Sequence, residues 1–308
     1  MWARVGRWAI RLLCIAALGL AAPAAANAQG RMATINGERL YYEVTGKGAP
    51  IVLIHGWSLN LEMWDPQVSA LTRCFRVIRY DRRGFGRSSG TEDATWDAAD
   101  LEALLDHLGE SKVHLLGMSQ AGRVALQFAH RNSDRVSSLI LHGATPPGGF
   151  GLPWSGADRN PFEAWARIAR EEGLDAFRRA WAAHPLMEVP AGRPDVRERL
   201  AGLLESYRGG RILNPPSPSG PVNPVTMEDL SLISAPTLVL IGETEVPYLQ
   251  IVAHALAYYL PNARLIAVPG GGHLINLIDP EAYNATVLEF LAEVDRSPCM
   301  STSRQFQR

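Results

Sequence analysis

Short apolar runs alternate along this chain with longer segments in which apolar residues recur at helical spacing. Apolar and β-branched runs between turn residues indicate buried strands, whereas apolar positions on one face of a 3.6-residue repeat indicate amphipathic helices. We predict strands over residues 51–54, 75–80, 113–116, 136–141, 237–241 and 263–268. We predict helices over residues 97–108, 120–130, 248–260 and 280–294.

A hairpin precedes these elements. Residues 32–44 contain two short stretches of strand-forming residues around Asn36-Gly37, a dipeptide that favours a type I′ turn. Its two strands bring the predicted total to eight. Strands that are apolar throughout and alternate with helices are typical of a mostly parallel sheet covered on both faces. The predicted fold class is therefore α/β, with a mostly parallel eight-stranded sheet.

One stretch, residues 146–227, interrupts the alternation because it contains no strand pattern. Proline- and glycine-rich segments enter and leave it, and amphipathic patterns lie between them at residues 161–183 and 195–207. A structureless loop of that length would be unusual in a compact domain. The predicted parts of the chain are a core over residues 29–145 and 228–295, an inserted helical cap over 146–227 and a disordered polar tail over 296–308.

The N-terminus has the pattern of an export signal. Three arginines precede an apolar run over residues 12–22, and Ala26-Asn27-Ala28 matches the small-residue pattern of a signal-peptidase site. We predict a signal peptide over residues 1–28, cleaved after Ala28, and a periplasmic or secreted mature protein with no stable membrane span. The apolar run is shorter than the roughly 20 residues that cross a bilayer. An uncleaved N-terminal anchor is the alternative.

The charge balance excludes a polyanionic partner. With 30 Lys+Arg against 31 Asp+Glu, the formal net charge is -1, whereas nucleic-acid binding needs a surplus of clustered cations. No Cys/His spacing is typical of a metal site, and we predict neither a metal nor another cofactor. Signal cleavage would leave Cys74 and Cys299. We expect no disulfide between them, because Cys74 begins a predicted core strand and Cys299 lies in a polar tail.

The segment Gly117-Met118-Ser119-Gln120-Ala121-Gly122 follows a predicted strand and opens a predicted helix. In a nucleophile elbow, a sharp strand-to-helix turn lifts a serine hydroxyl above the edge of the sheet. The crowded backbone there requires small residues two positions before and after the serine, and Gly117 and Ala121 occupy these positions. The alternative is a serine that caps the helix. The preceding strand favours Ser119 as a nucleophile.

A serine hydroxyl is a weak nucleophile until a neighbouring base takes its proton. His273 follows Gly270-Gly271-Gly272 just beyond the last predicted strand, where glycines allow the loop to bring an imidazole over the sheet. We therefore predict His273 as the base. Among the other histidines, His142 at the end of another strand is the weaker candidate.

A carboxylate beyond the strand over 237–241 would hold the imidazole in one tautomer and stabilise the imidazolium. Glu243 and Glu245 both lie in this position. We choose Glu245, because its distance past the strand suits a side chain that turns back toward His273. Glu243 is the alternative. The resulting chain order of serine, glutamate and histidine is the one that accompanies a nucleophile elbow.

The turn His55-Gly56-Trp57 follows the strand over 51–54. A tetrahedral intermediate requires preorganised N–H donors. We predict that the backbone N–H groups of Trp57 and Gln120 provide them as an oxyanion hole. We interpret His55 as a brace for this turn and not as a second base.

Together these segments resemble the α/β-hydrolase superfamily. The resemblance extends over about residues 33–294 and rests on His55-Gly56-Trp57, on Tyr80-Asp81-Arg82-Arg83-Gly84-Phe85-Gly86-Arg87-Ser88, on the elbow at Ser119 and on Gly271-Gly272-His273. The chain is most similar to the small capped enzymes around the 3-oxoadipate enol-lactone hydrolases, esterases and cofactor-free haloperoxidase-like proteins.

The resemblance also assigns roles and shows departures. It implies that Asp81 is structural. Ala121 stands where many members have glycine, and Glu245 stands where most have aspartate. A serine at the elbow argues against haloalkane dehalogenase and epoxide hydrolase chemistry, for which members of this superfamily have aspartate there.

These observations predict a serine hydrolase that cleaves a small carboxylic ester or lactone through an acyl-enzyme. The same triad could carry out C–C bond hydrolysis or perhydrolysis. A slow-turnover ligand-binding receptor of the same fold is an alternative of a different class. We expect Trp165, Trp181 and Met187 of the cap to line the substrate pocket and to favour a modest apolar or aromatic group.

Overall fold

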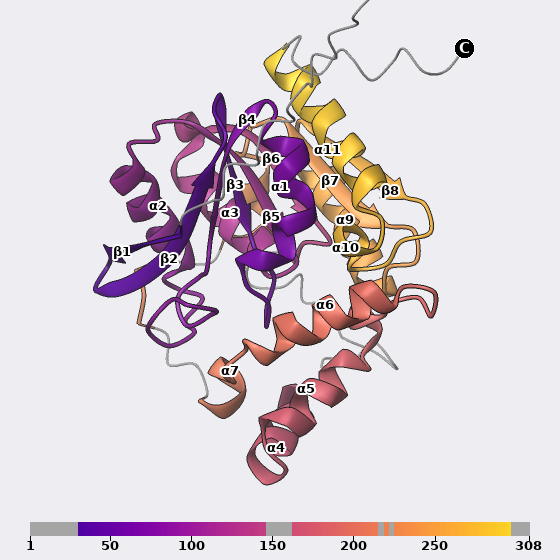
Figure 1. The fold of residues 1–308 in the computed structure, drawn as a ribbon. Coiled ribbons are helices and arrows are strands. Elements are labelled where there is room, and N and C mark those ends of the chain that lie inside the picture. Colours follow the sequence, from indigo (N-terminus) through magenta and orange to yellow (C-terminus); the bar gives the residue numbers. More distant parts are fainter. Residues whose placement is uncertain (1–29, 146–161, 215–218, 222–224, 297–308) are drawn as a thin grey trace, which may run out of the picture.

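A single sheet of eight strands forms the centre of the computed structural model, which describes residues 30–145, 162–214, 219–221 and 225–296 (Figure 1). The strands are β1 (Arg31–Ile35), β2 (Glu38–Thr45), β3 (Ala49–Ile54), β4 (Phe75–Tyr80), β5 (Val113–Met118), β6 (Val136–His142), β7 (Thr237–Gly242) and β8 (Ala263–Val268). Their order across the sheet is β1-β2-β4-β3-β5-β6-β7-β8. The pairs β1–β2 and β2–β4 are antiparallel and the other neighbours are parallel. The predicted mostly parallel eight-stranded sheet is confirmed.

Helices cover both faces of this sheet. They are α1 (Asp65–Leu71), α2 (Asp97–Leu108), α3 (Ala121–Arg131), α4 (Phe162–Glu171), α5 (Leu174–Ala182), α6 (Pro194–Glu205), α7 (Gly210–Leu213), α8 (Met227–Leu230), α9 (Pro247–Tyr259), α10 (Ile275–Ile278) and α11 (Pro280–Asp295). Short 3-10 turns lie at η1 (Leu61–Trp64), η2 (Ser133–Arg135) and η4 (Pro185–Met187). Helices α1, α10 and α11 contact one another on one face, and α2, α3, α8 and α9 form a connected group on the other (Figure 1).

The N-terminal hairpin has the predicted turn. Asn36 and Gly37 have φ values of 45° and 82°, and a type I′ turn requires positive φ at both central residues. The pairing of Ile35 with Glu38 closes the hairpin directly around this dipeptide. The Asn-Gly signal therefore predicts both the turn and the register of the two strands.

The central strands explain the continuous apolar runs in the sequence. Every residue of β5 and β7 is buried, because both faces of the sheet lie under helices. The structure adds η1, α1 and α10, which the sequence pattern did not predict. These elements are too short to show a repeating apolar stripe.

Between β6 and β7 the described chain contains helices and no strand. Helices α4 to α7 lie together beyond one end of the sheet, at the bottom of Figure 1. The amphipathic pattern over residues 161–183 is divided into α4 and α5 at Gly173, whose φ of 91° is incompatible with a continuous helix. The predicted cap boundary at residue 146, the signal peptide over residues 1–28 and the tail from residue 297 lie outside the described residues.

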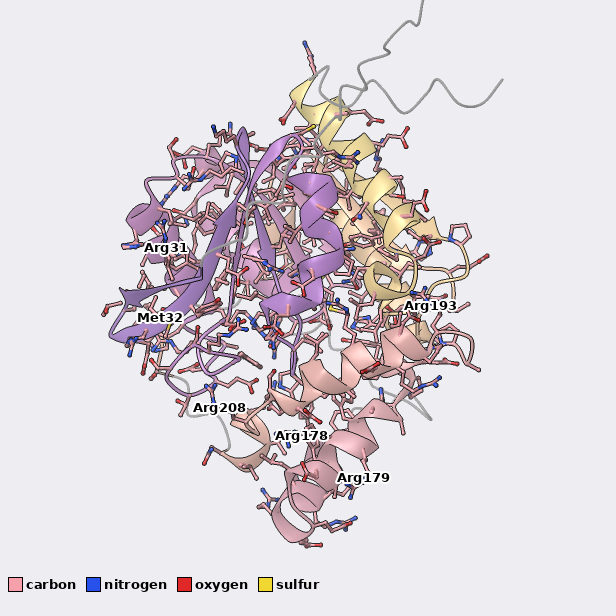
Figure 2. All side chains as sticks on the ribbon, in the orientation of Figure 1. Arg31, Met32, Arg178, Arg179, Arg193 and Arg208 are labelled. Atoms are coloured by element: carbon pink, nitrogen blue, oxygen red, sulfur yellow. The ribbon has the colours of Figure 1, made fainter. Side chains whose placement is uncertain are left out.

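Two arginines hold these helices in place. Arg178 on α5 donates hydrogen bonds to the carbonyl groups of Leu204 (3.1 Å) and Tyr207 (2.8 Å) at the end of α6. Arg208 donates to the carbonyl group of Ser88 (2.8 Å), in the loop after β4. Figure 2 labels both arginines among the side chains of this region. The last carbonyl groups of a helix have no partner within it, so Arg178 supplies one and ties α5 to α6.

Cys74 corrects an expectation from the sequence. It forms a disulfide bond whose partner lies outside the described residues, whereas we expected no disulfide there. Cys74 lies just before β4 and is partly exposed, so its sulfur is not enclosed in the core.

A bilayer-crossing helix would have to be longer and more apolar than any helix within residues 30–145, 162–214, 219–221 and 225–296.

Candidate active site

Ser119 lies at the sharp turn between β5 and α3. Its φ of 56° falls in the left-handed region, which residues other than glycine rarely adopt. The Ser119 N–H donates to the carbonyl group of His142 (2.8 Å), and the Thr145 N–H donates to the carbonyl group of Ser119 (3.1 Å). A Cβ added at Gly117 would lie 2.5 Å from the carbonyl oxygen of Ala121, which is the crowding expected there. Backbone strain held by its surroundings is typical of functional sites.

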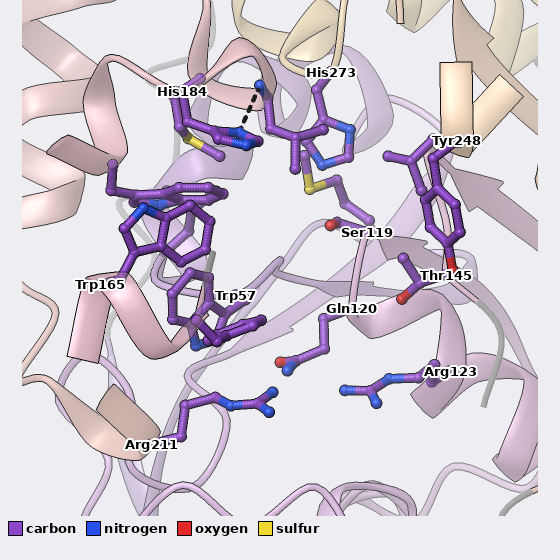
Figure 3. A pocket seen from close by; sticks show the side chains of 17 residues that line it. Trp57, Ser119, Gln120, Arg123, Thr145, Trp165, His184, Arg211, Tyr248 and His273 are labelled. Carbon is purple, nitrogen blue, oxygen red and sulfur yellow. Dashed lines mark hydrogen bonds between the residues drawn. The ribbon is translucent and has the colours of Figure 1, made fainter. Parts of the chain in front are cut away.

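The structure brings His273 and Glu245 together. Nδ1 of His273 lies 2.6 Å from Oε2 of Glu245, and both side chains are 1% exposed. The other carboxylate oxygen of Glu245 accepts a hydrogen bond from the Val246 N–H (3.0 Å). A carboxylate oxygen accepts, so Nδ1 is the donor of this bond and Nε2 is the ring nitrogen that remains for another partner. Figure 3 shows this imidazole beside Ser119 in one cavity.

Glu243 has a different position. Its side chain is exposed, and its carboxylate accepts a hydrogen bond from the Gly270 N–H (3.0 Å). Gly143 allows the closer pair to form, since a Cβ there would lie 2.8 Å from Nδ1 of His273 and 3.1 Å from Oε2 of Glu245. Glu245 is therefore the carboxylate that the structure places against His273.

His142, the weaker candidate for the base, is fully buried at the end of β6 and does not line the cavity. Its Nδ1 lies 3.3 Å from the hydroxyl of Tyr283. Burial, the largest effect, lowers the pKa of His142 to about 3. The ring is thus neutral at pH 7.

His55 braces the turn before Trp57. The N–H of Arg82 donates to Nε2 of His55 (2.9 Å), and Nδ1 donates to the carbonyl group of Gly56 (2.8 Å). With both ring nitrogens occupied, His55 has no lone pair left to act as a base. Burial, reinforced by the nearby charge of Arg82, lowers the pKa of His55 well below its ordinary value.

Asp81 likewise serves the backbone of this region. Its two carboxylate oxygens accept hydrogen bonds from the N–H groups of Leu61 and Arg87, both at 2.8 Å. Burial, partly offset by these bonds, raises its pKa to about 6. The carboxylate connects η1 to the loop after β4 and does not line the cavity.

The backbone N–H groups of Trp57 and Gln120 have no hydrogen-bond partner within the part of the chain that the structure describes. Both residues are buried and both line the cavity with Ser119. A Cβ added at Gly56 would lie 3.5 Å from Cβ of Ser119, so the turn that carries Trp57 packs against the elbow. Buried backbone donors rarely remain unpaired. These two donors therefore remain the candidates for the predicted oxyanion hole.

The cavity has a volume of about 240 Å³. Trp165, Trp181 and Met187 line it. The ring centroids of Trp165 and Trp181 lie 4.7 Å apart, and Nε1 of Trp181 donates to the hydroxyl of Ser58 (2.7 Å). The wall opposite Ser119 is therefore aromatic and is fastened to the turn that carries Trp57. The volume suits a small substrate.

Two cavity residues, Arg123 and Arg211, were not identified from the sequence. Arg123 could have been recognised from the sequence, because it is the only charged residue between Ala121 and Ala129 of α3 and lies one turn after the elbow. No sequence feature pointed to Arg211 on α7, since its position depends on how the helices between β6 and β7 fold. Among the described residues, no group of three or more His, Cys, Asp or Glu side chains could hold a metal ion.

Comparisons with known proteins agree on one family. The family model described as alpha/beta hydrolase fold matches residues 49–280. RutD of Azorhizobium caulinodans, provisionally named a carbamate hydrolase, is 30% identical over 83% of this chain and 96% of its own length. The pimeloyl-[acyl-carrier protein] methyl ester esterase of Nitrosomonas europaea is 28% identical over 79% and 96%. The structure of a thermophilic esterase from Thermogutta terrifontis has a TM-score of 0.70 and 28% identity, over 87% of this chain and 99% of that one.

Proposed function

This chain belongs to the α/β-hydrolase superfamily, and from this premise we propose that it is a serine hydrolase that cleaves a small carboxylic ester or lactone through an acyl-enzyme. The observation that carries the proposal is the arrangement around one cavity. Ser119 occupies a strained elbow, His273 lines the same cavity, and Glu245 lies 2.6 Å from Nδ1 of that histidine.

In the first step, the hydroxyl of Ser119 attacks the carbonyl carbon of the substrate. Nε2 of His273 takes the serine proton, and Glu245 stabilises the imidazolium through Nδ1–H. The N–H groups of Trp57 and Gln120 bind the negative oxygen of the tetrahedral intermediate. Their contribution is large because they are fixed before charge develops.

The intermediate collapses when the bond to the leaving oxygen breaks. His273 returns its proton to that oxygen, which departs as an alcohol, or stays tethered as a hydroxyl when the substrate is a lactone. Ser119 then carries the acyl group as an ester. Water attacks this ester with His273 again as base, and the cycle ends with a carboxylic acid product and free Ser119.

A fluorophosphonate probe tests this proposal directly. Such a probe phosphonylates an activated serine, so we expect a single modification that peptide mapping assigns to Ser119 and that prior denaturation prevents. Steady-state turnover of a chromogenic short-chain ester should accompany labelling. A stoichiometric burst without turnover would favour a ligand-binding receptor, and a label on any other residue would exclude Ser119 as the nucleophile.

The proposed location is the periplasm or the extracellular space. The arginine-led apolar N-terminus supports export. The disulfide at Cys74 supports it independently, because disulfides persist mainly in oxidising compartments.

Expression of the full-length chain in a Gram-negative host tests the location. We expect periplasmic protein that begins at Gln29 by N-terminal sequencing and in which Cys74 is disulfide-bonded by peptide mapping. The variant Ala28→Tyr removes the small residue that signal peptidase requires, and should accumulate as the precursor. Uncleaved wild-type protein in the cytoplasm would contradict the proposal.

A further inference from the structure

Two guanidinium groups lie on the cavity wall away from the reacting atoms. Arg123 is on α3, three residues after Gln120, so the two side chains share one face of that helix. Arg211 comes from α7, on the far side of the cavity. Figure 3 shows the two guanidinium groups pointing toward each other, with the side-chain amide of Gln120 between them.

The guanidinium of Arg123 has no hydrogen bond or ion pair with any residue that the structure describes. Its neighbour Arg82, in contrast, donates to Asp97 (2.9 Å) and to Oε1 of Gln120 (2.6 Å). Burial, the largest effect, lowers the pKa of Arg123 to about 10, which leaves it charged at pH 7. A partly buried cation without a partner is costly unless something else compensates it.

The carboxylates near this wall have other partners. Arg82 and Arg211 both lie close enough to Arg123 to disfavour its charge. The carboxylates beside them are Asp97, which is bound to Arg82, and Glu92. Oε2 of Glu92 already accepts hydrogen bonds from Nε1 of Trp57, from the hydroxyl of Tyr207 and from the backbone N–H of Arg211. Asp97 and Glu92 thus already have partners, and within the described part of the chain neither forms a side-chain ion pair with Arg123 or Arg211.

Gln120 adds an oriented donor. Arginine can only donate, so the amide oxygen of Gln120 must be the atom that faces Arg82. Its NH₂ group is consequently directed away from Arg82, and it has no acceptor in the described part of the chain. The cavity therefore presents two guanidinium groups and one amide donor. The guanidinium of Arg211 lies over the ring of Phe162, 4.3 Å from its centroid, and no hydrogen-bond acceptor among the described residues is paired to any of the three.

We propose that the substrate carries a carboxylate, separate from the group that is cleaved, and that Arg123, Arg211 and the amide of Gln120 bind it. The reaction of this substrate depends on the proposed function. The carboxylate-binding site does not, because it is inferred from the positions of the arginines. A carboxylate matches the fork of donors on a guanidinium and neutralises one charge. A phosphate monoester, with close to two charges at pH 7, would overcompensate it. Trp165 and Trp181 pack against the apolar part of the substrate.

Paired substrates test the proposal kinetically. 4-Nitrophenyl hydrogen glutarate and 4-nitrophenyl pentanoate differ by a carboxylate on the acyl group, and 3-carboxyphenyl acetate and phenyl acetate differ by one on the leaving group. We expect the acid to have the higher kcat/KM in at least one pair. Arg123→Gln should lower that ratio of acid to neutral ester roughly 10- to 100-fold, the range for a lost charge-assisted hydrogen bond. Arg211→Gln should shift it in the same direction.

Arg131→Gln is the matched control, since Arg131 is an exposed arginine at the other end of α3, and both ratios should stay unchanged. The proposal would be overturned if the wild type had the higher kcat/KM on the neutral ester in both pairs. It would also be overturned if Arg123→Gln lowered kcat/KM equally on the acid and the neutral ester.

A binding measurement separates this inference from the proposed reaction. In calorimetry with Ser119→Ala, monomethyl glutarate should bind and dimethyl glutarate should not, and Arg123→Gln in the same background should abolish the difference. This result would support the carboxylate site even if no ester were hydrolysed. Equal binding of the two compounds would refute the site even if Ser119 proved to be the nucleophile.

Discussion

Ser119→Ala is expected to lower kcat for a chromogenic short-chain ester by roughly 10⁶-fold, the loss measured when a serine hydrolase loses its nucleophile. The variant removes the only atom that forms the covalent intermediate, whereas the oxyanion donors and the cavity remain. Alanine has the same backbone preferences as serine to a good approximation, so the left-handed turn at position 119 should persist. A thermal melt close to that of the wild type would show that the loss is chemical and not structural.

Ser133→Ala is the matched control for this variant. Ser133 is exposed and lies just past the opposite end of α3. The Ser133→Ala variant should therefore hydrolyse the ester as fast as the wild type. Activity of the Ser119 variant within a few-fold of the wild type would remove the acyl-enzyme from consideration. In that case a water-mediated attack within the same cavity would have to be sought.

Glu245→Gln is expected to lower kcat by roughly 10⁴-fold, as in a serine protease whose triad aspartate is replaced by its amide. Both oxygens of Glu245 accept hydrogen bonds, from the Val246 N–H and from Nδ1 of His273. An amide has one oxygen for these two donors. If that oxygen pairs with Val246, the NH₂ group faces Nδ1 and selects the tautomer in which Nε2 carries the proton. His273 then cannot accept the proton of Ser119.

Glu243→Gln provides the comparison, because it makes the same chemical change two residues away. Its exposed carboxylate binds the Gly270 N–H, so we expect the loss to stay within a few-fold. The pH dependence and KM of both variants should be measured with one ester. A crippled Glu243 variant beside an active Glu245 variant would reverse the assignment of the acid.

Much of the fold follows from local pattern. The two positive φ values of a type I′ turn are available to Asn36-Gly37 at little cost, so that dipeptide determines its hairpin. Likewise β5 and β7 are recognisable because strands buried on both faces are apolar at every position. The division of residues 161–183 was not recognised, since Gly173 is tolerated within many helices and only its φ of 91° shows that it ends one.

The candidate site divides in the same way. The proposed nucleophile and base, Ser119 and His273, could be selected from the sequence because each depends on a local conformation. Ser119 needs a small residue on either side of a tight turn, and His273 needs a glycine-rich loop at a strand end. The bracing role of His55 is similar, since its ring bonds to the next residue and to the start of the loop after β4.

What the sequence by itself determined is therefore the sheet, the elbow and the chain order of the candidate catalytic residues, because all of these are encoded over a few neighbouring positions. Only the tertiary structure decided which glutamate contacts His273. Glu243 and Glu245 lie two residues apart on one loop, but Glu245 is buried against His273 and Glu243 is exposed. It alone also brought Arg123 and Arg211 to one wall of the cavity. Electrostatic balance depends on distances between segments far apart in the chain, and no local pattern records them.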